Sequence, residues 1–340
     1  MERERRSLRL GIGVIFLAVV LRLVSHGIGG SVLAFFGKPE TASFLVYLQS
    51  GRTIRLPRKE TVPGETAPPE TQPPQTQPTQ ETEPPQELPG FTAGDADLVK
   101  VTYHCGYEPD IGELLCRSLA WELTGQEPSV LIYHSHATES YTASPGEDYR
   151  ESSAYRTLDT DYNMVSVGEH LARLLRQQGI EVIHDVTLHD APSYSAAYTS
   201  SRKSVQDYLR EYPSIRLVID LHRDALSLDS QNQLDTHAQA GGQASAQLMM
   251  VVGTDDGGLT HPNWKENMAL ALKLHVTLEK ANPGITRPIS FRTQRFNQDL
   301  SPGAVLIEVG GAGDTHAEAL VAAEALAQAI ATLAHGANTE

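Results

Sequence analysis

The chain has 340 residues and a formal net charge of −15 at pH 7, and 40% of its residues are hydrophobic. Residues 1–59 carry +7, residues 60–97 carry −8 and residues 98–340 carry −14. An acidic folded portion excludes nucleic acid as an expected partner, because binding to nucleic acid depends on neutralising phosphates. The only two cysteines, Cys105 and Cys116, have no CxxC spacing, which excludes a disulfide scaffold and a cysteine-based zinc site. One disulfide or two free thiols both remain open.

Residues 1–36 predict a short cytoplasmic tail followed by a transmembrane anchor. Several arginines precede an apolar stretch from Leu10 to Phe36, which is long enough for the ~20 residues that span a bilayer. The basic flank should stay in the cytoplasm and place the rest of the chain outside. Arg22 interrupts the stretch, and the shorter run Leu10–Leu21 suits the alternative of a cleaved signal peptide.

Residues 60–97 predict a disordered linker rich in Pro, Thr, Glu and Gln. Residues 60–90 contain nine prolines and almost no apolar side chain, so they cannot bury enough surface to offset the entropy lost on ordering. Proline stiffens such a segment, which then acts as a spacer. Residues 37–59 form a juxtamembrane segment between anchor and linker.

Residues 98–336 alternate between strand and helix patterns. The apolar runs predict strands at 130–134, 180–185, 215–222, 246–253 and 304–311. The intervening segments predict helices at 163–179, 195–211, 264–281 and 315–336. This order predicts one α/β domain with a mostly parallel sheet and helices on both faces.

Three predicted strands carry metal-binding side chains at or near their ends. "VLIYHSH" ends in His134 and His136, "IRLVIDLH" ends in His222, and "AVLIEVGG" contains Glu308. The carboxyl ends of parallel strands meet at one edge of a sheet, so these side chains are expected to lie together. Two histidines and a carboxylate around an open position are typical of catalytic zinc, with a second carboxylate as the base.

Each of these residues also has a structural interpretation. In an extended segment His134 and His136 point to the same face and would simply line a strand end. In "DLHRD", Asp220 and Asp224 would form ordinary ion pairs with Arg223. Glu308 lies in an apolar run, where an unpartnered carboxylate is costly to bury, so a partner is required.

A further polar run follows the strand predicted at 180–185, and several common catalytic motifs are missing from the sequence. "IHDVTLHD" follows a strand and offers His184, Asp185, His189 and Asp190 as weaker site candidates. The chain has no GxSxG, HExxH, P-loop or GxGxxG motif, so serine hydrolase, nucleotide and dinucleotide chemistry are not indicated.

Six ordered stretches together resemble the stage II sporulation protein P family of endospore-forming bacteria. They are "FLVYLQSGR", "IYHSHATESY", "VGEHLARLLRQQGI", "VIHDVTLHD", "IRLVIDLHRDA" and "FNQDLSPGAVLIEVGG". The resemblance implies a fold similar to that of zinc-dependent N-acetylmuramoyl-L-alanine amidases. It implies hydrolysis of peptidoglycan stem peptides, by amidase and endopeptidase activity, together with sporulation proteins D and M during forespore engulfment.

The resemblance also assigns roles to residues. It makes His222 a zinc ligand and Glu308 the catalytic carboxylate. It favours His136 as the first histidine ligand, with His134 as an alternate ligand or a supporting residue. Glu139 fits the carboxylate ligand by the local motif, while related amidases use a Glu near the start of the next helix, where this chain offers Asp159, Asp161 and Glu169.

The anchor predicts a single-pass membrane protein, and the resemblance implies that its zinc-dependent hydrolase domain faces the intermembrane space of the sporangium. Arg223 is either a ligand for a substrate carboxylate or a structural residue. The alternative from a different class is a non-catalytic protein of the same fold that binds the cell wall or acts as a scaffold.

Overall fold

The computed structural model describes residues 90–336, except residues 120, 122, 124, 145, 148, 150, 154 and 227–232. The predicted anchor, the juxtamembrane segment and most of the linker lie outside the described residues. Residues 93–98 form a 3₁₀ helix, η2 (Ala93–Leu98), and Phe91 and Ala96 pack against the core. The packed part of the chain thus starts before residue 98, within the range predicted as linker.

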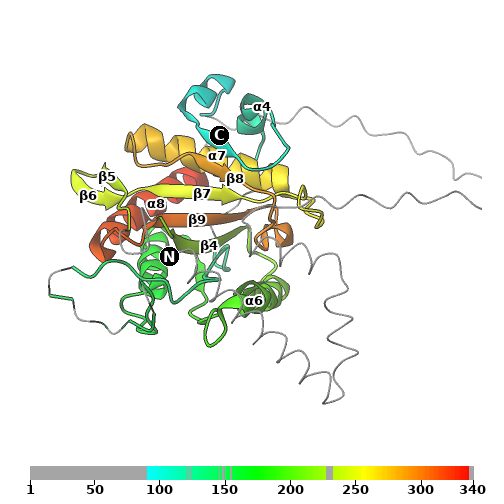
Figure 1. Cartoon of the computed structure of the whole chain (residues 1–340). Coiled ribbons are helices and arrows are strands. Elements are labelled where there is room, and N and C mark those ends of the chain that lie inside the picture. Colours follow the sequence, from blue (N-terminus) through cyan, green and yellow to red (C-terminus); the bar gives the residue numbers. More distant parts are fainter. Residues whose placement is uncertain are drawn as a thin grey trace, which may run out of the picture. The chain divides into compact units, whose positions relative to one another are not determined.

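One mixed sheet forms the centre of the domain (Figure 1). Its strands are β1 (Val101–Tyr103), β2 (Val130–Tyr133), β3 (Val182–His184), β4 (Leu217–Asp224), β7 (Leu248–Val252), β8 (Ile289–Phe291) and β9 (Ala304–Gly311). Their spatial order is β1-β8-β7-β9-β4-β2-β3. Five of the six neighbouring pairs are parallel, and only β7–β9 is antiparallel. The prediction of a mostly parallel α/β sheet is confirmed.

The antiparallel pair divides the sheet into two blocks. β9, β4, β2 and β3 run in one direction, while β7, β8 and β1 run in the other. The carboxyl ends of the first block therefore lie at the edge opposite to the carboxyl ends of the second. The first block contains every strand end that the sequence marked as a candidate site.

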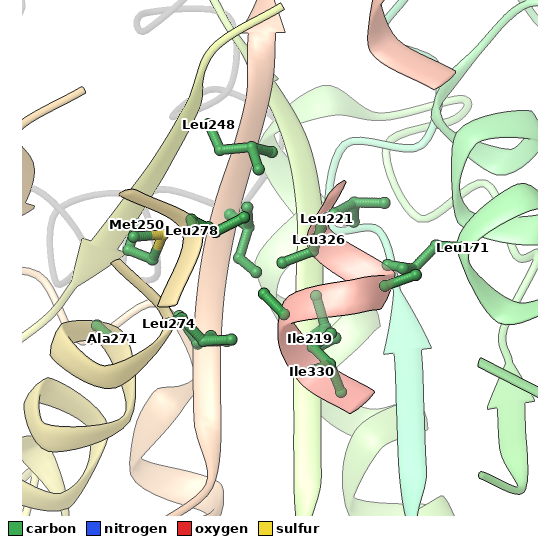
Figure 2. Packing of buried hydrophobic residues seen from close by; sticks show 14 of the residues in the cluster. Leu171, Ile219, Leu221, Leu248, Met250, Ala271, Leu274, Leu278, Leu326 and Ile330 are labelled. Atoms are coloured by element: carbon green, nitrogen blue, oxygen red, sulfur yellow. The ribbon is translucent and has the colours of Figure 1, made fainter. Parts of the chain in front are cut away.

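Four helices contribute to the main core on one side of the sheet, called here the helix-rich face. They are α4 (Ile111–Cys116), α5 (Met164–Gln177), α7 (Trp264–Ala281) and α8 (His316–Gly336). Their apolar side chains join the main core with alternate strand residues such as Ile219 and Leu221. Figure 2 shows Leu326 and Ile330 of α8 in this cluster.

The opposite face carries α6 (Ala197–Glu211) and is called here the α6 face. Val205 of α6 packs with Leu131, Tyr133 and Val218 in a second, smaller core. Helices on both faces were predicted, but their distribution is unequal, because α6 covers only part of its face and leaves strand ends beside it for polar groups.

Local sequence explains the best-defined helix. The side chain of Asn163 accepts a hydrogen bond from the backbone N–H of Val165 and so caps α5 at its first turn. Val167, Leu171 and Leu175 recur at the spacing of one helix face and are fully buried.

Several elements were not predicted, among them β1, β8 and α4. They include the hairpin β5 (His237–Ala240) and β6 (Gln243–Ala246), and the short 3₁₀ helices η3 (Tyr194–Ala196) and η4 (Gln298–Leu300). Cys105 and Cys116 are both free thiols.

Among the described residues, one segment, His316–Ala334 of α8, has the length and apolar composition of a membrane span. In this fold 56% of that segment is buried. Packing of α8 in the main core accounts for its composition without a membrane.

Candidate active site

A cluster of polar side chains lies on the α6 face, at the carboxyl ends of β4 and β9. His222 and Glu308 are register partners on these adjacent strands. Asp220 and His222 follow Val218 at alternate positions, so all three project toward the α6 face. Ile307 belongs to the main core, so Glu308 beside it also projects toward the α6 face.

His136 reaches this cluster from the turn that follows β2. Its ring centroid lies 5.4 Å from that of His222, and the two rings are nearly perpendicular. One face of the His136 ring stacks on Tyr194 at 4.3 Å, and Tyr198 of α6 lies 5.5 Å away. Burial and then the neighbouring His222 lower the pKa of His136, so the neutral, ligand-competent imidazole is favoured.

Glu139 is the carboxylate next to Nδ1 of His222. One of its oxygens lies 3.6 Å from Nδ1 of His222, and the same oxygen accepts a hydrogen bond from the backbone N–H of Arg223. The other oxygen accepts a hydrogen bond from Arg156 at 3.2 Å. Burial alone would raise the pKa of Glu139, but His222 and Arg223 together lower it to about 2.

His222 lies between two carboxylates. Asp220 is held in place by the backbone N–H and the hydroxyl of Ser135, and its Oδ1 lies 2.7 Å from Nε2 of His222. That contact is an ion pair without the alignment of a hydrogen bond, so Nε2 makes no hydrogen bond among the described residues. Burial disfavours a charged imidazole, yet Asp220 and Glu139 raise the pKa of His222 well above its usual value.

Glu308 differs from Glu139 and Asp220, because one of its oxygens receives no hydrogen bond from the described residues. Its Oε2 is buried without a hydrogen-bond partner among the described residues, although the side chain as a whole keeps partial exposure. Burial raises the pKa of Glu308 to about 8, helped by the negative charge of Glu139 and opposed by His222. A carboxyl group with a proton affinity near neutral pH suits general acid–base chemistry.

The family profile described as stage II sporulation protein P matches residues 52–331. The chain belongs to this family. Stage II sporulation protein P of Bacillus subtilis strain 168 is 30% identical over 218 residues, which cover 61% of this chain and 51% of that protein. The chain thus spans about half the length of this relative.

Solved structures with a similar course of the chain include three amidases. The N-acetylmuramoyl-L-alanine amidase AmiC2 of Nostoc punctiforme is 16% identical, covering 62% of this chain and 97% of its own, with a TM-score of 0.36. The CwlD amidase of Clostridioides difficile, solved in complex with the GerS lipoprotein, is 12% identical. The match covers 62% of this chain and 96% of that chain, with a TM-score of 0.37. The catalytic domain of the amidase CwlV from Bacillus (Paenibacillus) polymyxa var. colistinus is 14% identical. The match covers 60% of this chain and 95% of that chain, also with a TM-score of 0.37.

His134 lies apart from the cluster, on the helix-rich face. Its Nδ1 is hydrogen-bonded to the carbonyl oxygen of Leu221, and its Nε2 lies 2.9 Å from Nε2 of His184. Glu169 contacts the other nitrogen of His184 at 3.0 Å. Both nitrogens of His134 are therefore engaged, and Glu169, an alternative carboxylate ligand, lies beside His184 instead of His222.

The other predicted candidates have protein partners. Arg223 is buried, and its guanidinium donates to the carbonyl oxygens of Ser140 and Tyr155, which favours the structural interpretation. Asp224 pairs with Arg287 at 2.8 Å, so the ion pairs expected between Arg223 and its neighbours Asp220 and Asp224 are replaced by contacts with other residues. Asp159 and Asp161 are exposed residues of the turn before α5.

Sequence reasoning missed or underweighted three residues at the site. Asp190, in the polar run after β3, accepts hydrogen bonds from Thr138 and Arg156 and lies 3.9 Å from Nδ1 of His136. Arg156 bridges Asp190 and Glu139, and nothing in the sequence around it marks such a role. Tyr194 stacks on His136, and its place in a Ser- and Tyr-containing loop gave no signal.

The described residues contain no group of three or more His, Cys, Asp or Glu side chains arranged to hold a metal ion as they stand. The donor set nevertheless fits zinc. Nδ1 of His136, Nε2 of His222 and Oε2 of Glu308 are buried without hydrogen-bond partners in the described chain, which is costly unless something else binds there. Two imidazoles and the Glu139 carboxylate match the nitrogen and oxygen ligands of catalytic zinc.

Proposed function

We propose that this chain is a zinc-dependent peptidoglycan hydrolase that cleaves stem peptides, as an N-acetylmuramoyl-L-alanine amidase and endopeptidase. The single observation that carries the proposal is the cluster of His136, Glu139 and His222 beside Glu308, in which three buried polar atoms make no aligned hydrogen bond within the described chain. Membership of the stage II sporulation protein P family supports the substrate class.

His136, Glu139 and His222 would hold the zinc ion. When bound, zinc polarises a carbonyl group and lowers the pKa of a coordinated water. Neutral His136 is ready to ligate, whereas His222 must lose its proton first.

Glu308 would act as the general base toward the attacking water and then return the proton to the leaving amine. Its raised pKa places its proton exchange near neutral pH, where an acid–base group is most effective. Its position beside His222 on the next strand puts the carboxyl group within the same cluster.

Surrounding residues would fix the orientation of this machinery. Asp190 lies close to His136, and Asp220 lies close to His222, as carboxylates commonly do beside ligating histidines. Arg223 would hold Glu139 and the loop at residues 140–155, and not a substrate carboxylate. His134 would support β4 through the carbonyl of Leu221 and leave ligation to His136.

The location and partners are part of the proposal. The N-terminal segment would anchor the chain in the cell membrane, with the hydrolase domain in the intermembrane space of the sporangium. There it would act on peptidoglycan during engulfment of the forespore, together with sporulation proteins D and M.

The decisive experiment measures zinc content and cleavage of purified peptidoglycan by the detergent-purified full chain. We expect one zinc ion per chain, loss of activity on chelation and recovery on adding zinc. Intact peptidoglycan in the presence of bound or added zinc would instead support the alternative of a non-catalytic wall-binding protein of the same fold.

A further inference from the structure

A pocket of about 540 Å³ opens beside the cluster, on the side of His136. Asp190 and Tyr194 line it and also contact the cluster: Tyr194 stacks on His136, and Asp190 lies 3.9 Å from Nδ1 of the same ring. The pocket is therefore continuous with the candidate active site. A substrate bound at the cluster would extend into it.

The charges in the pocket are already balanced within the protein. Arg156 is the one cationic side chain in its lining, and it donates to Asp190 at 3.0 Å and to Glu139 at 3.2 Å. Asp190 is the one acidic lining residue, and its side chain is fully buried. An anionic ligand would meet a guanidinium committed to two carboxylates. The pocket therefore favours a neutral occupant.

The walls combine apolar, aromatic and hydroxyl groups. Leu158 and Tyr194 are each 56% exposed and both line this pocket, so they offer apolar and aromatic surface to an occupant. Leu188 and Pro192 add apolar surface on the same side as Tyr194. Hydroxyl groups come from Thr138, Ser152 and Ser153.

A sugar ring has the matching character: it is neutral, its C–H faces are apolar and its rim carries hydroxyl and acetamido groups. The stem peptide of peptidoglycan is a poorer match, because it carries free carboxylates. We propose that this pocket is a saccharide subsite, which binds an N-acetylated sugar ring of the glycan strand next to the bond to be cleaved. The inference rests on the proposed function, since it identifies the muramoyl side of the same substrate.

Binding can be measured without turnover by using the Glu308→Gln variant of the full chain in detergent. The probes are N-acetylmuramoyl-L-alanyl-D-isoglutamine and the same dipeptide without the sugar, titrated by calorimetry. We expect the sugar-bearing probe to bind at least about tenfold more tightly, a difference that one well-packed group can supply.

Leu158→Trp fills the pocket and should remove that preference. Leu259→Trp is the matched control, because Leu259 is 59% exposed and follows β7, whose carboxyl end lies at the opposite edge of the sheet. Ser153→Tyr gives a second, independent way to fill the pocket if Leu158→Trp impairs folding. Unchanged preference in both filled variants would overturn the inference.

Equal affinity for the two probes, or loss of dipeptide binding in Leu158→Trp, would assign the pocket to the peptide and also overturn the inference. The proposed function fails separately. If the wild type binds the sugar but never cleaves peptidoglycan, the subsite stands and the hydrolase assignment falls; if it cleaves without preferring the sugar, the reverse holds.

Discussion

Two histidine pairs lie on opposite faces of the same sheet, and their ring nitrogens are used differently. His134 and His184 are hydrogen-bonded to each other at 2.9 Å on the helix-rich face, and both continue to protein partners. On the α6 face, the ring centroids of His136 and His222 are 5.4 Å apart, and each ring has a buried nitrogen that makes no aligned hydrogen bond among the described residues. The first pair satisfies its own polar groups, whereas the second leaves positions that a ligand can take.

The largest expected effect is the loss of activity when Glu308 is replaced, which would distinguish it from a carboxylate with a structural role. Glu308→Gln keeps the shape of the side chain but cannot accept a proton, so cleavage of peptidoglycan should fall by ~100-fold or more. Zinc content and thermal stability should stay near those of the wild type, because burial raises the pKa of Glu308 to about 8 and the neutral amide replaces a carboxyl group that is largely uncharged at neutral pH. Loss of zinc in this variant would instead make Glu308 a ligand and displace Glu139 from that role.

The two histidine pairs should respond to truncation in opposite ways. His222→Ala should abolish both zinc binding and activity, because a ligand is removed. His134→Ala should retain zinc but lower the free energy of unfolding by about 1–3 kcal/mol, since it leaves His184 and the Leu221 carbonyl without their partner. Metal analysis and denaturant unfolding of both variants test this, and zinc loss in His134→Ala would contradict the assignment of His136.

Zinc affinity should depend on pH through His222. Because its pKa lies well above the usual value in the metal-free protein, zinc must displace a proton at neutral pH. Below that pKa the affinity should therefore rise by roughly tenfold per pH unit as the pH increases. Competition titrations with a chromophoric chelator between pH 6 and pH 8 would measure the slope, and a flat profile would show that His222 is not a ligand.

The smallest expected effect is a loss of stability when the packing against the His134–His184 pair is disturbed. A Cβ atom at Gly168 of α5 would lie 2.5 Å from Nε2 of His134 and 2.6 Å from Nε2 of His184. Gly168→Ala should thus destabilise the fold by about 1–3 kcal/mol while zinc binding persists. Gly112→Ala in α4 is the control, because its nearest neighbour, the Cβ of Ala93, would be 3.2 Å away. Equal unfolding midpoints for the two variants would argue against tight packing at the pair.

Much of the fold follows from local pattern. The apolar run at 304–311 predicted β9 with its observed bounds, and the periodic leucines at 163–179 predicted α5 to within two residues at its C-terminal end. The reversed direction of β7 was not predictable, because an apolar run is the same read in either direction. Its direction is set by the route of the chain through the β5–β6 hairpin, which has few apolar side chains to mark it.

The site residues at strand ends could be predicted from the sequence, whereas the site residues in loops could not. His134 and His136 were expected on one face, as in an extended strand, but β2 ends at Tyr133 and the next residues turn. The turn separates the two rings onto opposite faces of the sheet. Arg156 donates a hydrogen bond to Asp190, which lies 34 residues later in the sequence. Pairing over such a separation leaves no periodic pattern in the sequence.

The place where the packed chain begins has a practical consequence for handling the protein. Phe91 and η2 lie against α4 and α7, and β1 follows directly at the outer end of the sheet. Four strand-to-strand steps separate β1 from β4, or about 19 Å at ~4.8 Å per step. A surface linker attached through η2 would therefore hold the protein by the flank of the sheet away from β4, and should leave the approach to His222 open.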